Sequence, residues 1–363
     1  MNFRKFLYQL DFLLIAASLL LVMAGLLASY SLDMGGAGST LYLSQLSRVG
    51  IAFLVCLVFL YIDFEILTYY SVVFYTFLLL VLLGVLFFGT EINNSRSWLA
   101  LGGFRIQPSE PGKIIFILFM ASLLGQFKKE YLPYSKLLQC TALGLLPVIL
   151  ILLQGDLGTA IMYIPILGGM LWMSGIRPKV MIIILLCLLL VAPVGWMVLK
   201  DYQKQRIMTV FNPELDPQGI GYQTRQSLIA MGSGGFFGKG IGKGLHAQLG
   251  YVPESRTDFI FTLLVEEAGF VGAFFILTLY LIILWRMLEI SRNARNRSGL
   301  LITTGVICFF LSHLVINIGM ATGLLPAIGI PLPLLSYGGS SLLASTAALG
   351  LALNVHSRRF VNT

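Results

Sequence analysis

The sequence predicts an all-α, polytopic membrane protein with about ten transmembrane helices. Of its 363 residues, 57% are hydrophobic and only 11% are charged, whereas a soluble domain is about one quarter charged. The mean hydropathy is +0.88. Apolar runs recur along the whole chain, and a run of about 20 residues is long enough to cross a bilayer core. We therefore treat residues 1–363 as one transmembrane domain.

The first apolar run follows Arg4 and Lys5, as a signal peptide does, but it is too long for one and more spans follow it. We predict that it is retained as a helix. The cysteines lie in or beside apolar runs without CxxC spacing, so we expect no disulfide framework or metal cluster. The predicted spans are 11–31, 46–64, 67–89, 113–126, 137–153, 157–175, 180–199, 258–285, 300–323 and 336–355.

The distribution of Lys and Arg predicts that both termini face the cytoplasm. With the N-terminus inside, thirteen basic residues flank the cytoplasmic ends of the spans and four lie in short outer loops. Seven more lie in a long outer loop, 200–257, between the seventh and eighth spans. The net charge of +8 is therefore ascribed to cytoplasmic loops and contacts with membrane lipids, and nucleic acid is not an expected partner. The four basic residues in short outer loops are Arg48, Arg96, Arg105 and Lys113.

The outer segment before the fourth span contains Glu110 and Lys113, which are three residues apart. If a helix starts near Pro108, the two side chains share a face and form a local ion pair, with Ser109 as the cap. Charged residues that enter a bilayer are costly, which also makes them candidates for a functional site. The residues alone favour neither interpretation.

Two further outer segments carry polar groups. Asp156 stands in a tight turn between two spans, and we expect it to cap the following helix, with a secondary role in shaping an outer cavity. Proline and glycine interrupt residues 323–338, so this segment cannot be a regular helix. Irregular backbone near a membrane is tolerated where it is buried in protein or lines a wet cavity. We therefore expect the outer segments to converge on one cavity.

The long outer loop divides into three parts. Residues 200–211 are amphipathic, with Lys204 and Arg206 near the lipid head groups, and QTRQSLIA has helical character. The glycine-rich stretch after it carries Lys239 and Lys243. Glycine lets backbone N–H groups approach an anion, and the lysines add charge. The alternative is a flexible linker, but the interleaved apolar residues favour a folded loop on the membrane surface.

Asp258 follows in PESRTDFIF, at the mouth of the eighth span. As a structural residue it would be stabilised by the helix dipole, with Thr257 as the cap. As a functional residue it could serve as a general base or as a ligand for a divalent cation. These alternatives stay open from the residues alone.

Several polar residues lie inside predicted spans. His313 and Asn317 are four residues apart, so they share a helix face. We expect a buried polar pair that bridges helices; a proton relay is the sharper alternative. At least one of Glu266 and Glu267 must face protein or water, since exposure of a carboxylate to hydrocarbon costs roughly 2.5 kcal/mol or more. We assign no role to His246.

Five motifs, in order, resemble those of the SEDS proteins, the RodA and FtsW group. They are SRSWLALGGFRIQPSEPGK, QGDLGT, GYQTRQSLIAMGSGGFFGKG, PESRTDFIF with EEAGFVG, and GLLPAIGIPLPLLSYGGSS. The resemblance covers essentially the whole chain. It departs from the family pattern at Pro111 and Gly112, at Gly155 and at Arg256.

The resemblance implies a peptidoglycan glycosyltransferase of the bacterial cytoplasmic membrane. Such an enzyme polymerises lipid II on the outer face and works with a class B penicillin-binding protein. The family's essential aspartate corresponds to Asp258, and its glutamate and lysine correspond to Glu110 and Lys113. No organic cofactor is implied, and a divalent cation, Mg or Mn, is expected as an option at Asp258.

The implied reaction needs a base near a sugar hydroxyl, cations for a diphosphate and an apolar slot for the lipid. Asp258 is the candidate catalytic residue. Alternatives are a lipid II flippase, a scaffold for a partner enzyme, or an FtsW-type polymerase of division or sporulation; the short N-terminal tail favours the RodA type for cell elongation. Candidates for binding substrate or diphosphate are Glu110, Lys113, Arg206, Lys239 and Arg256, and supporting cavity residues are Asp156, Gln223 and Ser336.

Overall fold

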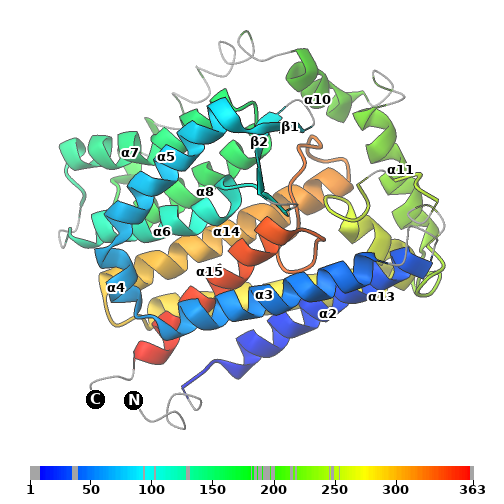
Figure 1. Ribbon diagram of the computed structural model, residues 1–363, viewed down its shortest axis with the longest axis horizontal. Helices are drawn as coiled ribbons and strands as arrows, with labels where there is room; N and C mark the ends of the chain where they lie inside the picture. The colour runs from blue at the N-terminus through cyan, green and yellow to red at the C-terminus, as the bar shows by residue number, and fades with distance from the viewer. Residues whose placement is uncertain are drawn as a thin grey trace.

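Long apolar helices run side by side along the longest dimension of the computed structural model (Figure 1). Six of those that the structure describes are long and apolar enough to cross a membrane. They are α2 (Phe12–Met34), α3 (Leu41–Tyr61), α5 (Ser71–Phe88), α7 (Tyr134–Leu153), α13 (Ile260–Arg292) and α14 (Arg297–Ala321). The structure describes residues 9–34, 40–92, 95–101, 104–127, 131–180, 201–212, 219–244 and 254–359, with isolated positions between 182 and 252.

Shorter helices complete the bundle: α4 (Phe64–Tyr69), α6 (Ser109–Gly125), α8 (Leu157–Met173) and α15 (Gly339–Arg358). Within the described residues, each predicted span except 180–199 corresponds to one helix, which confirms the all-α, polytopic fold. Most of 180–199 lies outside the described residues, and the number ten stays a prediction. The predicted helical character of the long outer loop is also confirmed, by α10 (Asp201–Phe211) and α11 (Ile220–Ser233).

The interior of the bundle is formed by α14, which packs against α6, α8, α13 and α15 (Figure 1). Lipid tails are as apolar as a leucine side chain, so helices in a membrane associate through close packing and polar contacts. Gly350 of α15 shows the closeness of the approach to α3, because a Cβ there would lie 2.6 Å from the carbonyl oxygen of Cys56. Because of this packing, other helices of the protein surround the ends of α6, α14 and α15.

A glycine turn interrupts α13 at Gly269, whose φ of 66° and ψ of −161° are not helical. The glycine-rich stretch supplies the hydrogen bonds that the interruption removes. The N–H groups of Lys239 and Gly240 donate to the carbonyls of Glu266 and Glu267, at 3.1 and 2.9 Å. In return, the Phe270 N–H donates to the Gly235 carbonyl at 3.0 Å. The expectation of a folded loop is thus confirmed, since nonhelical backbone at this depth must be paired within the protein.

An antiparallel sheet lies at the outer end of the bundle, in the order β1 (Thr90–Ile92), β2 (Ser95–Leu101) and β3 (Phe104–Ile106). Thr90 pairs with Trp98, and Leu99 pairs with Ile106. The sequence of this segment predicts a loop and not a sheet. Strands of three residues give almost no periodic signal, and here pairing between neighbouring segments creates them. The sheet leads directly into α6, which carries Glu110 and Lys113.

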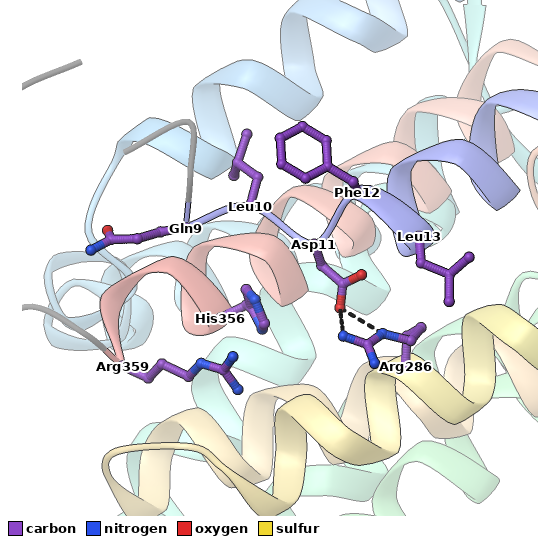
Figure 2. Close-up of a pocket in the computed structure, with 8 residues that line it drawn as sticks. All are labelled: Gln9, Leu10, Asp11, Phe12, Leu13, Arg286, His356 and Arg359. Carbon is purple, nitrogen blue, oxygen red and sulfur yellow. Dashed lines mark hydrogen bonds and ion pairs between the residues drawn. The ribbon is translucent and has the colours of Figure 1, made fainter. Parts of the chain in front are cut away.

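The start of α2 and the end of α15 lie at the same, inner end of the bundle, as the predicted orientation requires. Figure 2 shows a pocket of about 370 Å³ there, lined by residues from both helices, with Asp11 held by Arg286 at 2.7 Å. Arg358 forms a second inner ion pair with Asp63 at 2.7 Å. Arg286 and Arg358 therefore hold helix ends together at this end of the bundle.

Candidate active site on the outer face

Asp258 lies in a tight turn that ends just before α13. The N–H groups of Thr257 and Asp258 both donate to the carbonyl of Glu254, at 3.1 and 3.2 Å. The helix begins only at Ile260, and no side chain caps it. The prediction that Thr257 caps this helix is therefore wrong, because the turn places its hydroxyl on Glu254 instead, 3.1 Å from the carboxylate. The half-buried Asp258 side chain is likewise left without a capping role.

Four hydrogen bonds, two of them through Asn317, fasten this turn to the proline-rich segment 323–338. Asn317 of α14 donates to the carbonyls of Asp258 and Ile330, at 2.8 and 2.6 Å. The hydroxyl of Ser336 donates to the Thr257 carbonyl at 2.6 Å, and the Tyr337 N–H donates to the Arg256 carbonyl at 3.0 Å. Two segments far apart in the sequence thus form one rigid unit around Asp258.

Gly329 faces the Asp258 carboxylate from this segment. A Cβ at Gly329 would lie 3.4 Å from Oδ2 of Asp258, and the φ of Gly329 is +76°, a conformation that favours glycine. The proline-rich segment thus passes Asp258 at van der Waals distance without covering it with a side chain. The carboxylate keeps the partial exposure that a reacting group requires.

The surroundings of Asp258 raise its pKa from 3.8 to about 7. Burial is the largest cause, and the negative charge of Glu254 acts in the same direction. A hydrogen bond from Thr257 and the positive charge of Arg206 oppose the increase. A carboxyl group with a pKa near neutrality can both accept and release a proton at physiological pH.

Arg206 of α10 therefore acts on Asp258 through its charge. This agrees with the expectation that the outer segments converge. Gln223 lies on α11, four residues before Ser227, so the two share a helix face. The Ser227 hydroxyl lies 2.6 Å from that of Thr262 in α13 and donates to the Ala321 carbonyl at 2.8 Å. This packs α11 and the half-buried Gln223 against the ends of α13 and α14. Arg256 is exposed beside Asp258.

Glu110 and Lys113 form the predicted ion pair, at 2.6 Å, and both are buried in the protein. Lys113 also lies 3.1 Å from Nε2 of His313 in α14. The other nitrogen, Nδ1, lies 2.8 Å from the Phe309 carbonyl, which can only accept. Nδ1 therefore carries the proton, and Nε2 accepts from Lys113. His313 bridges α14 to α6 as predicted, whereas Asn317 joins α14 to the turn of Asp258 and to the irregular segment at Ile330 and does not bridge to a helix.

The start of α6 corrects one prediction. The helix begins at Ser109 itself, so Ser109 is its first residue and its hydroxyl does not cap. The carbonyl of Ser109 instead accepts from the Tyr163 hydroxyl at 2.8 Å. The helix continues through Pro111 and Gly112, and a Cβ at Gly112 would lie 2.8 Å from that hydroxyl. These departures from the family pattern thus suit a close approach of α6 and α8.

Asp156 caps α8 as predicted, by accepting from the Thr159 N–H at 3.0 Å. It also accepts from Nε2 of Gln107 at 2.6 Å, and the Gln107 N–H donates to Ser340 of α15 at 3.1 Å. Gln107, which follows β3 and has no assigned role from the sequence, therefore contacts the start of α8 through its side chain and α15 through its backbone N–H. Asp156 is linked through it to the outer end of α15.

Lys239 donates to the carboxylate of Glu266 at 2.7 Å, and His246 lies 2.9 Å from the same oxygen. Glu266 and Glu267 are both buried in protein, which satisfies the expectation for this pair. The N–H groups expected to cradle an anion donate instead to α13, as does that of Gly242 to Glu267 at 3.1 Å. This network lies roughly two helical turns beyond Asp258 along α13.

Among the described residues, no group of three or more His, Cys, Asp or Glu side chains forms a ready metal centre. The turn at Asp258 nevertheless places a second carboxylate, that of Glu254, close enough to act on it electrostatically. Magnesium is typically held by one or two carboxylates together with substrate phosphates. Asp258 and Glu254 fit a cation of that kind, which the substrate would share.

These features define a polytopic membrane protein with a carboxylate site at its outer end, supported by buried ion pairs. The chain belongs to the family of FtsW, RodA and SpoVE proteins, described as cell cycle proteins, whose model matches residues 5–360.

Three similar proteins have curated names. Peptidoglycan glycosyltransferase MrdB of Escherichia coli is 38% identical over 78% of this chain and 77% of its own. Peptidoglycan glycosyltransferase RodA of Treponema pallidum is 32% identical over 96% and 98%. Stage V sporulation protein E of Bacillus subtilis is 40% identical over 77% and 76%.

Two solved structures have the same fold. A chain of a peptidoglycan synthase complex, described for its coordination of polymerization and crosslinking, has a TM-score of 0.83 and 30% identity over 97% of this chain and 98% of its own. The rod shape determining protein RodA of Thermus thermophilus has a TM-score of 0.73 and 28% identity over the same shares.

Proposed function

We propose that this protein is a peptidoglycan glycosyltransferase that polymerises lipid II at the outer face of the bacterial cytoplasmic membrane during cell elongation. The observation that carries the proposal is the setting of Asp258. Its carboxyl group lies at the outer end of the bundle, in a turn fixed by Asn317 and Ser336, and its pKa is near 7. Relatives named as glycosyltransferases over most of the chain support this assignment.

Asp258 acts in this proposal as the general base. A sugar hydroxyl of one lipid-linked substrate attacks the anomeric carbon of the other and forms the new glycosidic C–O bond. The hydroxyl proton passes to the Asp258 carboxylate, and the bond between the anomeric carbon and the diphosphate breaks. A base is most effective when its pKa lies close to the working pH, which is where the surroundings of Asp258 place it.

The leaving diphosphate requires positive charge, and Arg206 and Arg256 are the nearest candidates from the sequence analysis. Arg206 already acts on Asp258 through its charge, and Arg256 is two residues away from Asp258 with an exposed side chain. A guanidinium can bind a phosphate through two parallel hydrogen bonds. In the alternative to the general-base role, Asp258 and Glu254 would hold a divalent cation that supplies further charge to the diphosphate.

Glu110 and Lys113 have a positioning role in this proposal. Lys113 holds His313, which lies one helical turn from Asn317 on the same face of α14. Asn317 in turn holds the backbone of Asp258. The buried ion pair thus fixes the face of α14 from which Asn317 holds the backbone of Asp258. We assign Lys239 to the glycine turn, because Glu266 accepts its hydrogen bond.

The proposed partner is a class B penicillin-binding protein, which would crosslink the glycan strand. Support comes from the likeness to a chain of a peptidoglycan synthase complex over nearly the full length. Co-purification of the chain with the class B proteins of its own cell envelope tests this part. Recovery of none of them from crosslinked membranes would contradict it.

The test of the activity uses the purified full chain in nanodiscs with lipid II, with and without the partner. We expect a ladder of glycan polymers and stoichiometric release of undecaprenyl diphosphate. Transfer of lipid II between leaflets of sealed vesicles without polymer would indicate a flippase instead. Polymer formation only by the partner would reduce the chain to a scaffold.

A further inference from the structure

Arg48 is the sole charged residue within α3, one of the candidate membrane spans. Placing a charge inside such a helix costs free energy, so a charged residue there is a candidate for a functional role. Its guanidinium lies over the ring of Tyr337, 4.2 Å from the ring centre. Among the residues that the structure describes, no carboxylate pairs with it. Lys113 and Lys239, by contrast, are each neutralised by a glutamate.

Within the described part of the chain, the Arg48 guanidinium donates no hydrogen bond to the protein, so its N–H groups are available to a ligand while its charge lies over the ring. Tyr337 is itself fixed from two sides. Its N–H donates to the Arg256 carbonyl at 3.0 Å, and its hydroxyl lies 3.3 Å from that of Ser44. Arg48 is therefore held on a rigid platform that is bonded directly to the turn of Asp258.

The outer end of α15 lies against the same side chain. A Cβ at Gly339, the first residue of α15, would lie 3.9 Å from Cδ of Arg48. The cap position is Gly338, and no side chain caps the helix. The N–H groups of the first helical turn have no intrahelical partners and carry a partial positive charge. A cation and an uncapped helix start thus adjoin one another.

Gln45 provides an independent sign of a bound group. It lies three residues before Arg48 on the same face of α3, and it is 2% exposed. Its Nε2 donates to the Ser336 carbonyl at 3.5 Å, next to Tyr337, whereas its Oε1 is buried without a hydrogen-bond partner among the described residues. Leaving such a buried acceptor unpaired destabilises the protein. A ligand with a hydroxyl or amide beside an anion would satisfy both groups once the Gln45 side chain turns toward it.

We propose that Arg48, stacked on Tyr337 beside the start of α15, binds the diphosphate of a lipid-linked sugar. Gln45 would accept from a hydroxyl or amide of the adjacent sugar. This inference rests on the proposed function for the identity of the lipid, but not for the anion chemistry of the site. It adds a subsite on α3 and α15 to the cations that the sequence analysis had selected.

The test measures binding of undecaprenyl diphosphate to the full chain in zwitterionic nanodiscs, which requires no turnover. We expect Arg48→Gln to weaken binding about tenfold or more, since a charge-assisted bond to phosphate is lost. Tyr337→Phe should bind nearly as the unchanged protein does, because it keeps the ring, whereas Tyr337→Leu should weaken binding. Arg105→Gln, at an exposed outer arginine, is the matched control and should have no effect.

Polymerisation by the same variants provides a second measurement. Arg48→Gln should raise KM for lipid II more than it lowers kcat, because its loss weakens binding. Inorganic pyrophosphate should compete in the unchanged protein and much less in Arg48→Gln. Competition by phosphatidylglycerol equal to that by undecaprenyl diphosphate would assign the site to phospholipid head groups and overturn the proposal.

Unchanged binding in both Arg48→Gln and Tyr337→Leu would also overturn it. If Arg48→Gln elutes as an aggregate, Arg48→Lys and Tyr337→Leu decide the matter, and each should weaken binding because a lysine cannot form the stacked, forked contact. Failure of the unchanged protein to polymerise lipid II would refute the proposed function. Diphosphate binding that depends on Arg48 would survive that result, so the two failures are distinguishable.

Discussion

Asn317, about one turn from the outer end of α14, holds the backbone of Asp258. One amide nitrogen donates to the Asp258 carbonyl at 2.8 Å and to the Ile330 carbonyl at 2.6 Å. The Asn317 side chain is fully buried, so these bonds face no competition from water. The single side chain thereby sets the distance between the turn that carries the carboxylate and the segment that passes in front of it.

Replacing Asn317 with Leu should lower both stability and turnover. Two buried carbonyls lose their donor, which costs about 1–3 kcal/mol each, and the turn of Asp258 loosens. Asn354→Leu is the matched control, because Asn354 is also buried and donates to the carbonyls of Phe59 and Leu60, at 2.8 and 2.9 Å. Thermal unfolding should show destabilisation of both variants. Only Asn317→Leu should lower kcat per folded molecule, and equal kcat values would contradict the assigned role.

The buried pair of Glu110 and Lys113 should show strong coupling. Lys113→Met leaves the Glu110 carboxylate buried without its cation, which typically costs about 3–5 kcal/mol. Adding Glu110→Gln removes the stranded charge, so the double variant should recover much of the stability. Thermal unfolding of the two single variants and the double variant measures the coupling. Additive losses would show that the two residues act independently.

Gly238 and Gly235 allow packing to be separated from backbone strain. Both have positive φ, +79° and +57°, so alanine strains the backbone at each. A Cβ at Gly238 would lie 2.1 Å from the carbonyl oxygen of Glu267, whereas one at Gly235 meets no atom within 4 Å. Gly238→Ala should therefore release the glycine turn from α13, and Gly235→Ala should not. Hydrogen exchange at 239–242 should rise only in the former; equal protection in both would refute this packing.

The rate of polymerisation should depend on the ionisation of Asp258. As a base it must be ionised, so the rate should rise with pH through about 7 and then level off. Glu254→Gln should move this rise to lower pH by removing a like charge, and Arg206→Gln should move it to higher pH. Because the pKa of Asp258 is higher in the folded than in the unfolded state, its ionisation makes stability fall between about pH 4 and 7. The increase in rate cannot then come from increased stability.

A profile that is flat across pH 6–8, or that moves in the opposite direction in these variants, would contradict the general-base assignment. Arg105→Gln again serves as the control, and its midpoint should equal that of the unchanged protein. Measuring kcat/KM at low lipid II reports the ionisation of the free protein, to which this pKa belongs.

The sequence predicted those features that depend on nearby residues. The apolar runs gave the helices, the spacing of Glu110 and Lys113 gave their ion pair, and Asp156 stood where a cap was expected. These predictions succeed because hydropathy, helical spacing and capping act over a few residues.

The surroundings of Asp258 could not be predicted in the same way. Its contacts with Asn317, Gly329 and Ser336 join segments that are about 60 to 80 residues apart, and no local pattern encodes them. The start of α13 at Ile260 lies within two residues of the predicted start, and the turn at Glu254 precedes it. Arg48 was counted only for orientation, although a lone charge in an apolar span was the signal that marked it.

The central claim is that Asp258 carries out the chemistry of lipid II polymerisation. The most direct test compares the unchanged protein with Asp258→Asn, which keeps the size and polarity of the side chain but cannot take a proton. At pH 8 the variant should unfold at a temperature no lower than the unchanged protein, bind undecaprenyl diphosphate and form no glycan polymer from lipid II. Substantial polymer from the folded Asp258→Asn variant, measured without other polymerases, would contradict the account.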